Sequence, residues 1–275
     1  MAVDARAQRY LSAMGIQVWE HRTQPATADA AAAPVPRRAL GAEPAPAARE
    51  SGLPPCPVPP DSPAAHASSR PESAGPERPQ APAATQVARM NWETLQATVA
   101  VCTACELHRG RSNTVFGVGN RQAEWMIIGE APGAEEDRQG EPFVGRAGRL
   151  LNAMLEAVGL TREQVYIANV LKCRPPGNRD PKAEEIACCH AYLARQIALV
   201  RPRLILTVGR ISAQSLLQSD APVGRLRGRV HILPGSEIPL VVTYHPAYLL
   251  RKPTEKRKAW ADLKLARAAL QQPTD

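Results

Sequence analysis

Large aromatic side chains are scarce in this sequence of 275 residues: they make up 4% of the chain, which has only two phenylalanines. That content gives no sign of an extended surface for stacking nucleic-acid bases. Long apolar runs are also missing, and none reaches the ~20 residues that a membrane-spanning helix needs. The first residues, MAVDARAQRYLSAMG, have neither the basic start nor the apolar stretch of a signal peptide. We therefore expect a cytoplasmic protein with no membrane partner.

Nucleotide-binding glycine motifs are absent: neither G-x-G-x-x-G nor G-x4-G-K-[ST] occurs in the chain.

Cysteines are few. Six cysteines in a chain expected to be cytoplasmic do not suggest a disulfide framework. Cys102 and Cys105 form a C-x2-C pair, and Cys173 and Cys189 follow later. Four thiolates can hold either zinc or an iron–sulfur cluster, and their spacing alone leaves both open.

The formal net charge of the chain is +8. A basic balance favours a polyanionic partner such as nucleic acid. Near the carboxyl end, Arg251 and the basic run 252–258 could contact phosphates, or could simply form a solvated surface.

The first third of the sequence differs in composition from the rest. Residues 23–90 are dominated by Ala, Pro, Ser and Arg, with no helical or strand period, which predicts a disordered linker. Residues 1–22 carry a small apolar patch, which suggests either a docking peptide or a helix that folds back on the main domain. Within it, MGIQVW followed by an arginine resembles the N-terminal peptide of the psi subunit of the bacterial replicative clamp loader, which implies the clamp loader as a partner.

Residues 91–275 have the pattern of an α/β domain. Four short apolar runs rich in β-branched residues predict strands: AEWMIIGE, QVYIANVLKC, PRLILTVG and IPLVVTYHP. Helical patterns lie between and around them. This alternation predicts a three-layer αβα sandwich with a central, mainly parallel four-stranded sheet. Ligands of such folds bind at the carboxyl ends of the strands, where segments 129–148 and 169–179 and the segment around His245 fall.

Three side chains in these segments could contact a ligand. Phe143, in the glycine-rich loop Gly129–Gly148, is either a core anchor or a surface on which a base stacks. Asn169 needs partners for both halves of its amide, which could be a pyrimidine edge or two neighbouring strands. His245 follows an apolar strand and could donate a hydrogen bond to developing negative charge, or could be structural.

The segments GEAPGAEEDRQGEPFVGRAGRLL, NVLKCRPPGNRDP and HPAYLLR, in this order with these cysteines, closely resemble the family 4 uracil-DNA glycosylases. The resemblance covers about Trp92 to Leu270 and leaves out residues 1–90. It implies an αβα fold with a structural [4Fe–4S] cluster, whose ligands would be Cys102, Cys105, Cys173 and Cys189. Cys188 stands where a small residue is expected and would not be a ligand.

The same resemblance implies a monomeric enzyme that acts on a uracil flipped out of single- or double-stranded DNA. Phe143 would stack on the uracil, Asn169 would read its edge, and Gly129 would lie against it. Glu136 would crowd the 5-position of the ring and exclude the methyl group of thymine.

The implied chemistry is hydrolysis of the N-glycosidic bond. His245 would stabilise the leaving uracil anion, and Glu130 or Asn178 would orient the water. No lysine nucleophile is apparent, which suggests an enzyme that leaves an abasic site.

Three alternatives differ from this interpretation. A branch of the superfamily becomes covalently trapped through a histidine in a KRRIH loop, but the corresponding segment here, CRPPGNRDPK, has no histidine. A non-catalytic DNA-binding or partner-recruiting protein with a four-cysteine zinc site remains open. So does a glycosylase with a wider range of lesions, including hypoxanthine or xanthine.

Overall fold

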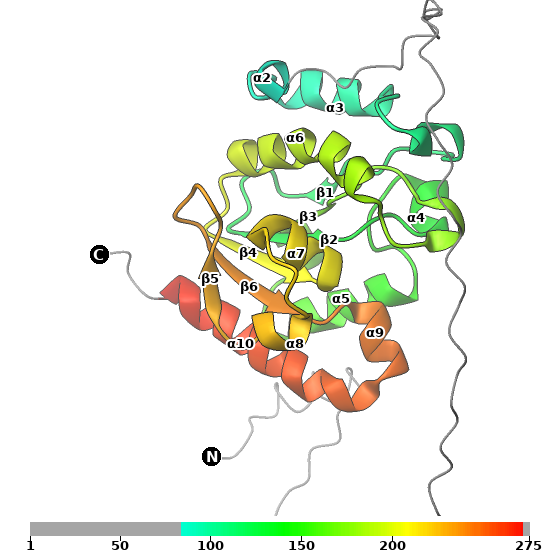
Figure 1. Ribbon diagram of the computed structural model, residues 1–275. Helices are drawn as coiled ribbons and strands as arrows, with labels where there is room; N and C mark the ends of the chain where they lie inside the picture. Colours follow the sequence, from blue (N-terminus) through cyan, green and yellow to red (C-terminus); the bar gives the residue numbers. More distant parts are fainter. Residues whose placement is uncertain (1–83, 272–275) are drawn as a thin grey trace, which may run out of the picture. The chain divides into compact units, whose positions relative to one another are not determined.

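The computed structural model describes residues 84–271 of the chain (Figure 1). The expected docking peptide 1–22 and most of the expected linker 23–90 lie outside these residues.

A six-stranded sheet in the order β1-β3-β2-β4-β6-β5 forms the centre of the fold. Its four inner strands are parallel and are the four predicted from the sequence: β3 (Tyr166–Asn169), β2 (Trp125–Gly129), β4 (Leu204–Val208) and β6 (Pro239–Thr243). The edge strands β1 (Val118–Gly119) and β5 (Val230–Ile232) run antiparallel to their neighbours. They were not predicted, because two or three partly exposed residues leave no recognisable pattern.

Helices cover both faces of the sheet, which confirms the predicted α/β class. Ile127 and its neighbours on one face pack against α5 (Arg146–Ala157) and α10 (Lys256–Gln271). Ile128 and its neighbours on the other face pack against α6 (Ala183–Val200) and α7 (Arg210–Leu217). Because both sides of each inner strand are buried, these strands read as continuous apolar runs.

Two helices precede the sheet and pack on the outer side of α6 (Figure 1): α2 (Ala84–Val87) and α3 (Trp92–Ala100). Val87 and Met90 are 1% and 9% exposed, and Nε of Arg195 donates a hydrogen bond to the carbonyl oxygen of Met90 at 2.6 Å. The domain boundary expected at residue 91 is therefore too late. Alanine-rich composition concealed this short helix and the segment after it, whose apolar side chains Val87 and Met90 are both buried.

The remaining helices are short and were not predicted: α4 (Ala134–Gln139), α8 (Val223–Leu226), α9 (Pro246–Arg251) and the 3-10 turns η1 (Glu106–Arg109), η2 (Arg162–Gln164), η3 (Pro176–Asn178) and η4 (Pro253–Glu255). The most relevant is α4, since it interrupts the segment that we interpreted as one continuous loop. It ends at Gly140, whose φ of 77° favours glycine. Nowhere in residues 84–271 is a helix long and apolar enough to cross a bilayer.

Candidate active site and cysteine pocket

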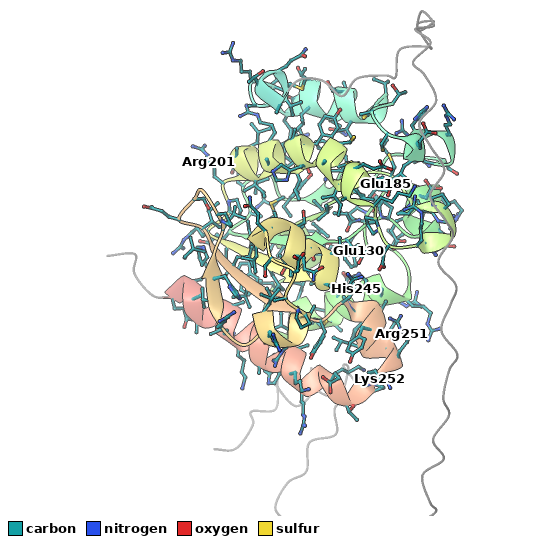
Figure 2. All side chains as sticks on the ribbon, in the orientation of Figure 1. Glu130, Glu185, Arg201, His245, Arg251 and Lys252 are labelled. Atoms are coloured by element: carbon teal, nitrogen blue, oxygen red, sulfur yellow. The ribbon has the colours of Figure 1, made fainter. Side chains whose placement is uncertain are left out.

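A cavity of about 450 Å³ opens at the carboxyl ends of the parallel strands. Six of the predicted site residues line it: Glu130, Glu136, Phe143, Asn169, Asn178 and His245. Figure 2 labels Glu130 and His245 in this region, with Arg251 on the neighbouring α9. The structure therefore brings together residues that are more than a hundred positions apart in the sequence.

Asn169 is the last residue of β3 and is paired in register with Gly129, the last residue of β2. Its side chain is 2% exposed, and among the described residues its Oδ1 is the one buried side-chain oxygen or nitrogen without a hydrogen-bond partner. A Cβ atom at Gly129 would lie 2.4 Å from this Oδ1 and 2.6 Å from Cζ of Phe143. Gly129 was also predicted as a site residue. Its missing side chain is needed so that Asn169 and Phe143 can approach this closely.

Phe143 lies between α4 and α5 and adopts a left-handed backbone conformation, with φ of 55°. Its side chain is buried, and its ring lies at 30° to that of His245 with the centroids 5.6 Å apart. Phe143 therefore contributes to the core and also lines the cavity.

Glu136, on α4, holds the surrounding loop through its carboxylate. Its oxygens accept hydrogen bonds from the backbone N–H groups of Gly133, Val144 and Gly145 at 3.1, 3.2 and 3.4 Å. Glu136, which was predicted to crowd the base, therefore also links the start of α4 to the segment after Phe143 through these hydrogen bonds.

His245 caps the amino terminus of α9, and its Nδ1 accepts a hydrogen bond from the backbone N–H of Ala247 at 3.1 Å. Burial, with a smaller contribution from nearby Arg251, lowers the pKa of His245 to about 4. The imidazole is therefore uncharged at neutral pH. Because Nδ1 is an acceptor, the single ring proton is assigned to Nε2.

Glu130 and Asn178 occupy different environments at the cavity. Burial, reinforced by the negative charge of Asp180, raises the pKa of Glu130 above its usual value. Asn178 is exposed, and its Oδ1 accepts a hydrogen bond from Nε of Arg174 at 2.7 Å. Of the two, Glu130 has the environment of a proton acceptor.

Several residues at the site were missed by the sequence analysis. Arg179 lines the cavity, as does Arg251, which the sequence had indicated only as a possible phosphate contact. Arg162 lies behind it and donates hydrogen bonds to the carbonyl oxygens of Pro142 and Phe143. Arg162 lies within the expected domain but outside the three segments that were predicted to form the ligand site. Its neighbouring residues contain no motif that indicates a functional role.

The four cysteines predicted as ligands, with Cys188, line a second and separate small cavity. Burial raises the pKa of Cys105 to about 11 and that of Cys189 to about 12. Two donors already face the sulfur atoms: Nη1 of Arg111 lies 3.1 Å from Sγ of Cys173, and the hydroxyl of Tyr192 lies 3.3 Å from Sγ of Cys102. Hydrogen bonds of this kind are typical around metal thiolates.

Lys172 also lines the cysteine pocket, and its ammonium group is completely buried. It donates hydrogen bonds to the carbonyl oxygen of Asn169 at 2.8 Å and to Oε1 of Gln196 at 2.6 Å. Burial lowers its pKa to about 8, and the charges that oppose this shift are those of Cys189 and Cys173. A buried cation beside the cysteines suits a group that carries negative charge.

The arrangement of the cysteines bears on which kind of group they could hold. Among residues 84–271, no three His, Cys, Asp or Glu side chains stand close enough to hold a single ion. In a four-iron cluster each cysteine binds a different iron, so its ligands are spread around the group.

Residues 116–264 match the family model of the uracil DNA glycosylase superfamily, and the chain belongs to this superfamily. Within it, the chain is similar to proteins named type-4 uracil-DNA glycosylase, which confirms the resemblance seen in the motifs. The protein of Archaeoglobus fulgidus is 45% identical over 169 residues, covering 59% of this chain and 85% of that protein. The protein of Pyrobaculum aerophilum is 42% identical over 180 residues (63% and 92%), and that of Thermotoga maritima 43% over 161 residues (58% and 83%).

Proposed function

We propose that this chain is a DNA repair glycosylase that flips uracil out of DNA and hydrolyses its N-glycosidic bond, leaving an abasic site. The superfamily match and the type-4 relatives support this activity. The observation that carries it in this chain is the unpaired Oδ1 of Asn169 inside the cavity. A buried acceptor without a partner costs roughly 1–3 kcal/mol, and a ligand that presents an N–H group there would remove that cost.

Uracil has the required edge. Its N3–H would donate to Oδ1 of Asn169, and its O4 would accept from Nδ2. Cytosine presents an acceptor at N3 and a donor at N4, so it would oppose like groups in this amide orientation. A site that depends on such hydrogen bonds can reject the wrong ligand by a factor of about 10⁴ or more.

The other faces of the base would be recognised by shape. Phe143 would stack on the ring, and Glu136 would occupy the space beside the 5-position. Lack of contacts to a methyl group discriminates by only about 1–3 kcal/mol, so exclusion of thymine needs a wall of this kind. The backbone hydrogen bonds of Glu136 support this role, since they keep its carboxylate in place.

The reaction would use water. The water oxygen bonds to C1′ of the deoxyribose, its proton passes to the carboxylate of Glu130, and the electron pair of the broken bond leaves on uracil. Nε2–H of His245 would donate to O2 of the departing anion without transferring a charge. Asn178 is the alternative for orienting the water, but its engagement with Arg174 favours Glu130.

We further propose that Cys102, Cys105, Cys173 and Cys189 hold a [4Fe–4S] cluster. Bound there, the group would supply iron–sulfur bonds that tie the segment after α3 to the segment after β3 and to α6. Hydrolysis moves no electron, so this role is structural. Cys188 donates a hydrogen bond from Sγ to the carbonyl oxygen of Ala104 at 3.5 Å, which supports leaving it out of the ligand set.

A direct test uses the purified chain and single-stranded oligonucleotides that each contain one uracil, thymine or cytosine, followed by alkali cleavage. Cleavage at uracil alone is the expected result. Binding of the uracil oligonucleotide with no release of base would instead favour the non-catalytic DNA-binding alternative. Oligonucleotides with hypoxanthine or xanthine would measure the lesion range, and a double-stranded substrate the strand preference.

The wider setting also remains a proposal. We propose a monomer that acts in the cytoplasm at the nucleoid, with residues 1–22 as a docking peptide for the replicative clamp loader. Residues 1–22 lie outside the described part of the chain. The support for this partner is therefore the sequence of the peptide alone.

A further inference from the structure

Phe143 has an unusual backbone for a bulky residue. Its φ of 55° lies in the left-handed region, which side chains other than glycine rarely adopt. Such backbone strain is unfavourable and persists only where the surroundings impose it. The contacts that impose it here should therefore matter for what the ring does.

Gly148, on α5, makes the conformation sterically possible. A Cβ atom at Gly148 would lie 1.7 Å from the carbonyl oxygen of Phe143, so this oxygen occupies space that any other residue would fill. The absence of a Cβ atom at Gly148 permits the left-handed backbone of Phe143, but it does not stabilise that conformation.

Arg162 holds it. From η2, Nη1 of its guanidinium donates to the carbonyl oxygen of Phe143 at 3.3 Å, and Nη2 donates to the carbonyl oxygen of Pro142. Nη1 also lies 3.4 Å from Oδ1 of Asn152 on α5, which steadies the fork. The planar guanidinium suits this task because it presents several donors in fixed directions.

Glu136 binds the backbone of the two residues that follow Phe143, Val144 and Gly145. It accepts from the N–H groups of Val144 and Gly145, while Arg162 donates to the carbonyl groups of residues 142 and 143. The turn that carries the Phe143 ring is thus held between a cation on its carbonyl groups and an anion on its N–H groups.

We propose that Arg162 is a positioning residue that acts through Phe143, fixing its backbone so that the ring presents a face to the extruded base. The inference rests on the proposed function, in which a base stacks on that ring. Arg162 does not line the cavity, so it would act without touching the substrate.

The position of the ring can be measured without any substrate, because the chain has only two phenylalanines, Phe116 and Phe143. Full-length protein labelled with 4-fluorophenylalanine should give two fluorine resonances, and Phe143→Leu assigns them. Arg162→Met should shift or broaden the Phe143 signal and leave that of Phe116 in place, whereas Arg162→Lys should have a smaller effect. An unmoved Phe143 signal would overturn the proposal.

Kinetics separate positioning from general stability. Arg162→Met should lower kcat/KM for uracil release about 10- to 100-fold in the parent chain, but by less than about threefold in the Phe143→Ala background, because residues that act through one another are not additive. Equal losses in both backgrounds would contradict the proposal. The matched control is Arg203→Met: Arg203 bonds Glu124 and the carbonyl oxygen of Leu270 away from the cavity, and its loss should leave kcat/KM unchanged.

The two proposals fail separately. No uracil release by the parent chain would refute the proposed function, and the fluorine spectra would still decide whether Arg162 places the Phe143 ring.

Discussion

The imidazole of His245 can donate a hydrogen bond without carrying a charge. A neutral donor suits a leaving anion, because it stabilises the charge that develops without attracting negative groups beforehand. Burial both lowers the pKa of His245 and strengthens its interaction with the anion.

This state predicts a particular pH dependence. The pKa of His245 is about 4 in the folded chain and near its usual value of about 6.5 when unfolded. We expect kcat to show no step near pH 6.5, and His245→Asn to lower kcat by about 10²- to 10³-fold.

The same pKa difference affects stability. As the pH falls, the unfolded state takes up the proton first, so the free energy of unfolding should fall between about pH 6.5 and pH 4, and fall less in His245→Asn. Rate profiles and urea unfolding at pH 7 and pH 5 measure both; a histidine step near pH 6.5 would contradict the assignment.

Asn169 gives a prediction in which activity and stability diverge. Asn169→Ala should lower kcat/KM for uracil by at least about 100-fold, because it removes both hydrogen bonds to the base. The free energy of unfolding should fall little, because the substitution also removes a buried acceptor without a partner. Kinetics and thermal unfolding of the same sample test this. A parallel loss of both would show that Asn169 is mainly structural.

The side chains that line the cavity could be predicted from the sequence, whereas those that hold them in place could not. Phe143, Asn169 and His245 stand beside glycine, proline or strand-end signals that mark a ligand site. Arg162 matters because η2 approaches a turn 20 residues earlier in the chain, and such an approach exists only in the folded molecule. Lys172 was equally hidden, since a lysine after a strand gives no sign that it is fully buried.

Helix α6 contributes neighbouring cysteines to the cysteine pocket, Cys188 and Cys189. Consecutive residues on a helix point about 100° apart, so the two thiols cannot take the same position. If the proposed cluster is present, Cys173→Ala should abolish its visible absorption and lower the melting temperature. Cys188→Ala, the matched control, should leave both nearly unchanged. Iron content, absorption spectra and melting curves check this; loss of iron in Cys188→Ala would show that it is a ligand.

Strands buried on both faces were the most predictable elements. The runs that form β2 and β6 are long enough and apolar enough to be recognised alone. Strands β1 and β5 exist through pairing with a neighbour, and α4 is too short to show a period. Elements whose stability comes from contacts far away in the sequence leave little trace in their own residues.

The described domain begins before the residue that composition suggested, and truncations can test this. Deleting residues 1–83 should leave excision from short oligonucleotides close to that of the full chain. Deleting residues 1–90 also removes the buried side chains of Val87 and Met90, and losing even one such side chain costs roughly 2–5 kcal/mol. The longer deletion should therefore melt at a lower temperature. Equal melting temperatures would show that α2 contributes nothing.

The sheet order has a consequence for how the protein is made. The cavity needs the segments after β2, β3 and β6, and β6 joins the sheet only by pairing with β4 and, at the edge, β5. On the ribosome, a chain that has emerged only as far as β4 has one of its long apolar strands unpaired on one side, and no His245. The cavity is therefore completed late in synthesis, when β6 pairs with β4 and brings His245 to the strand ends.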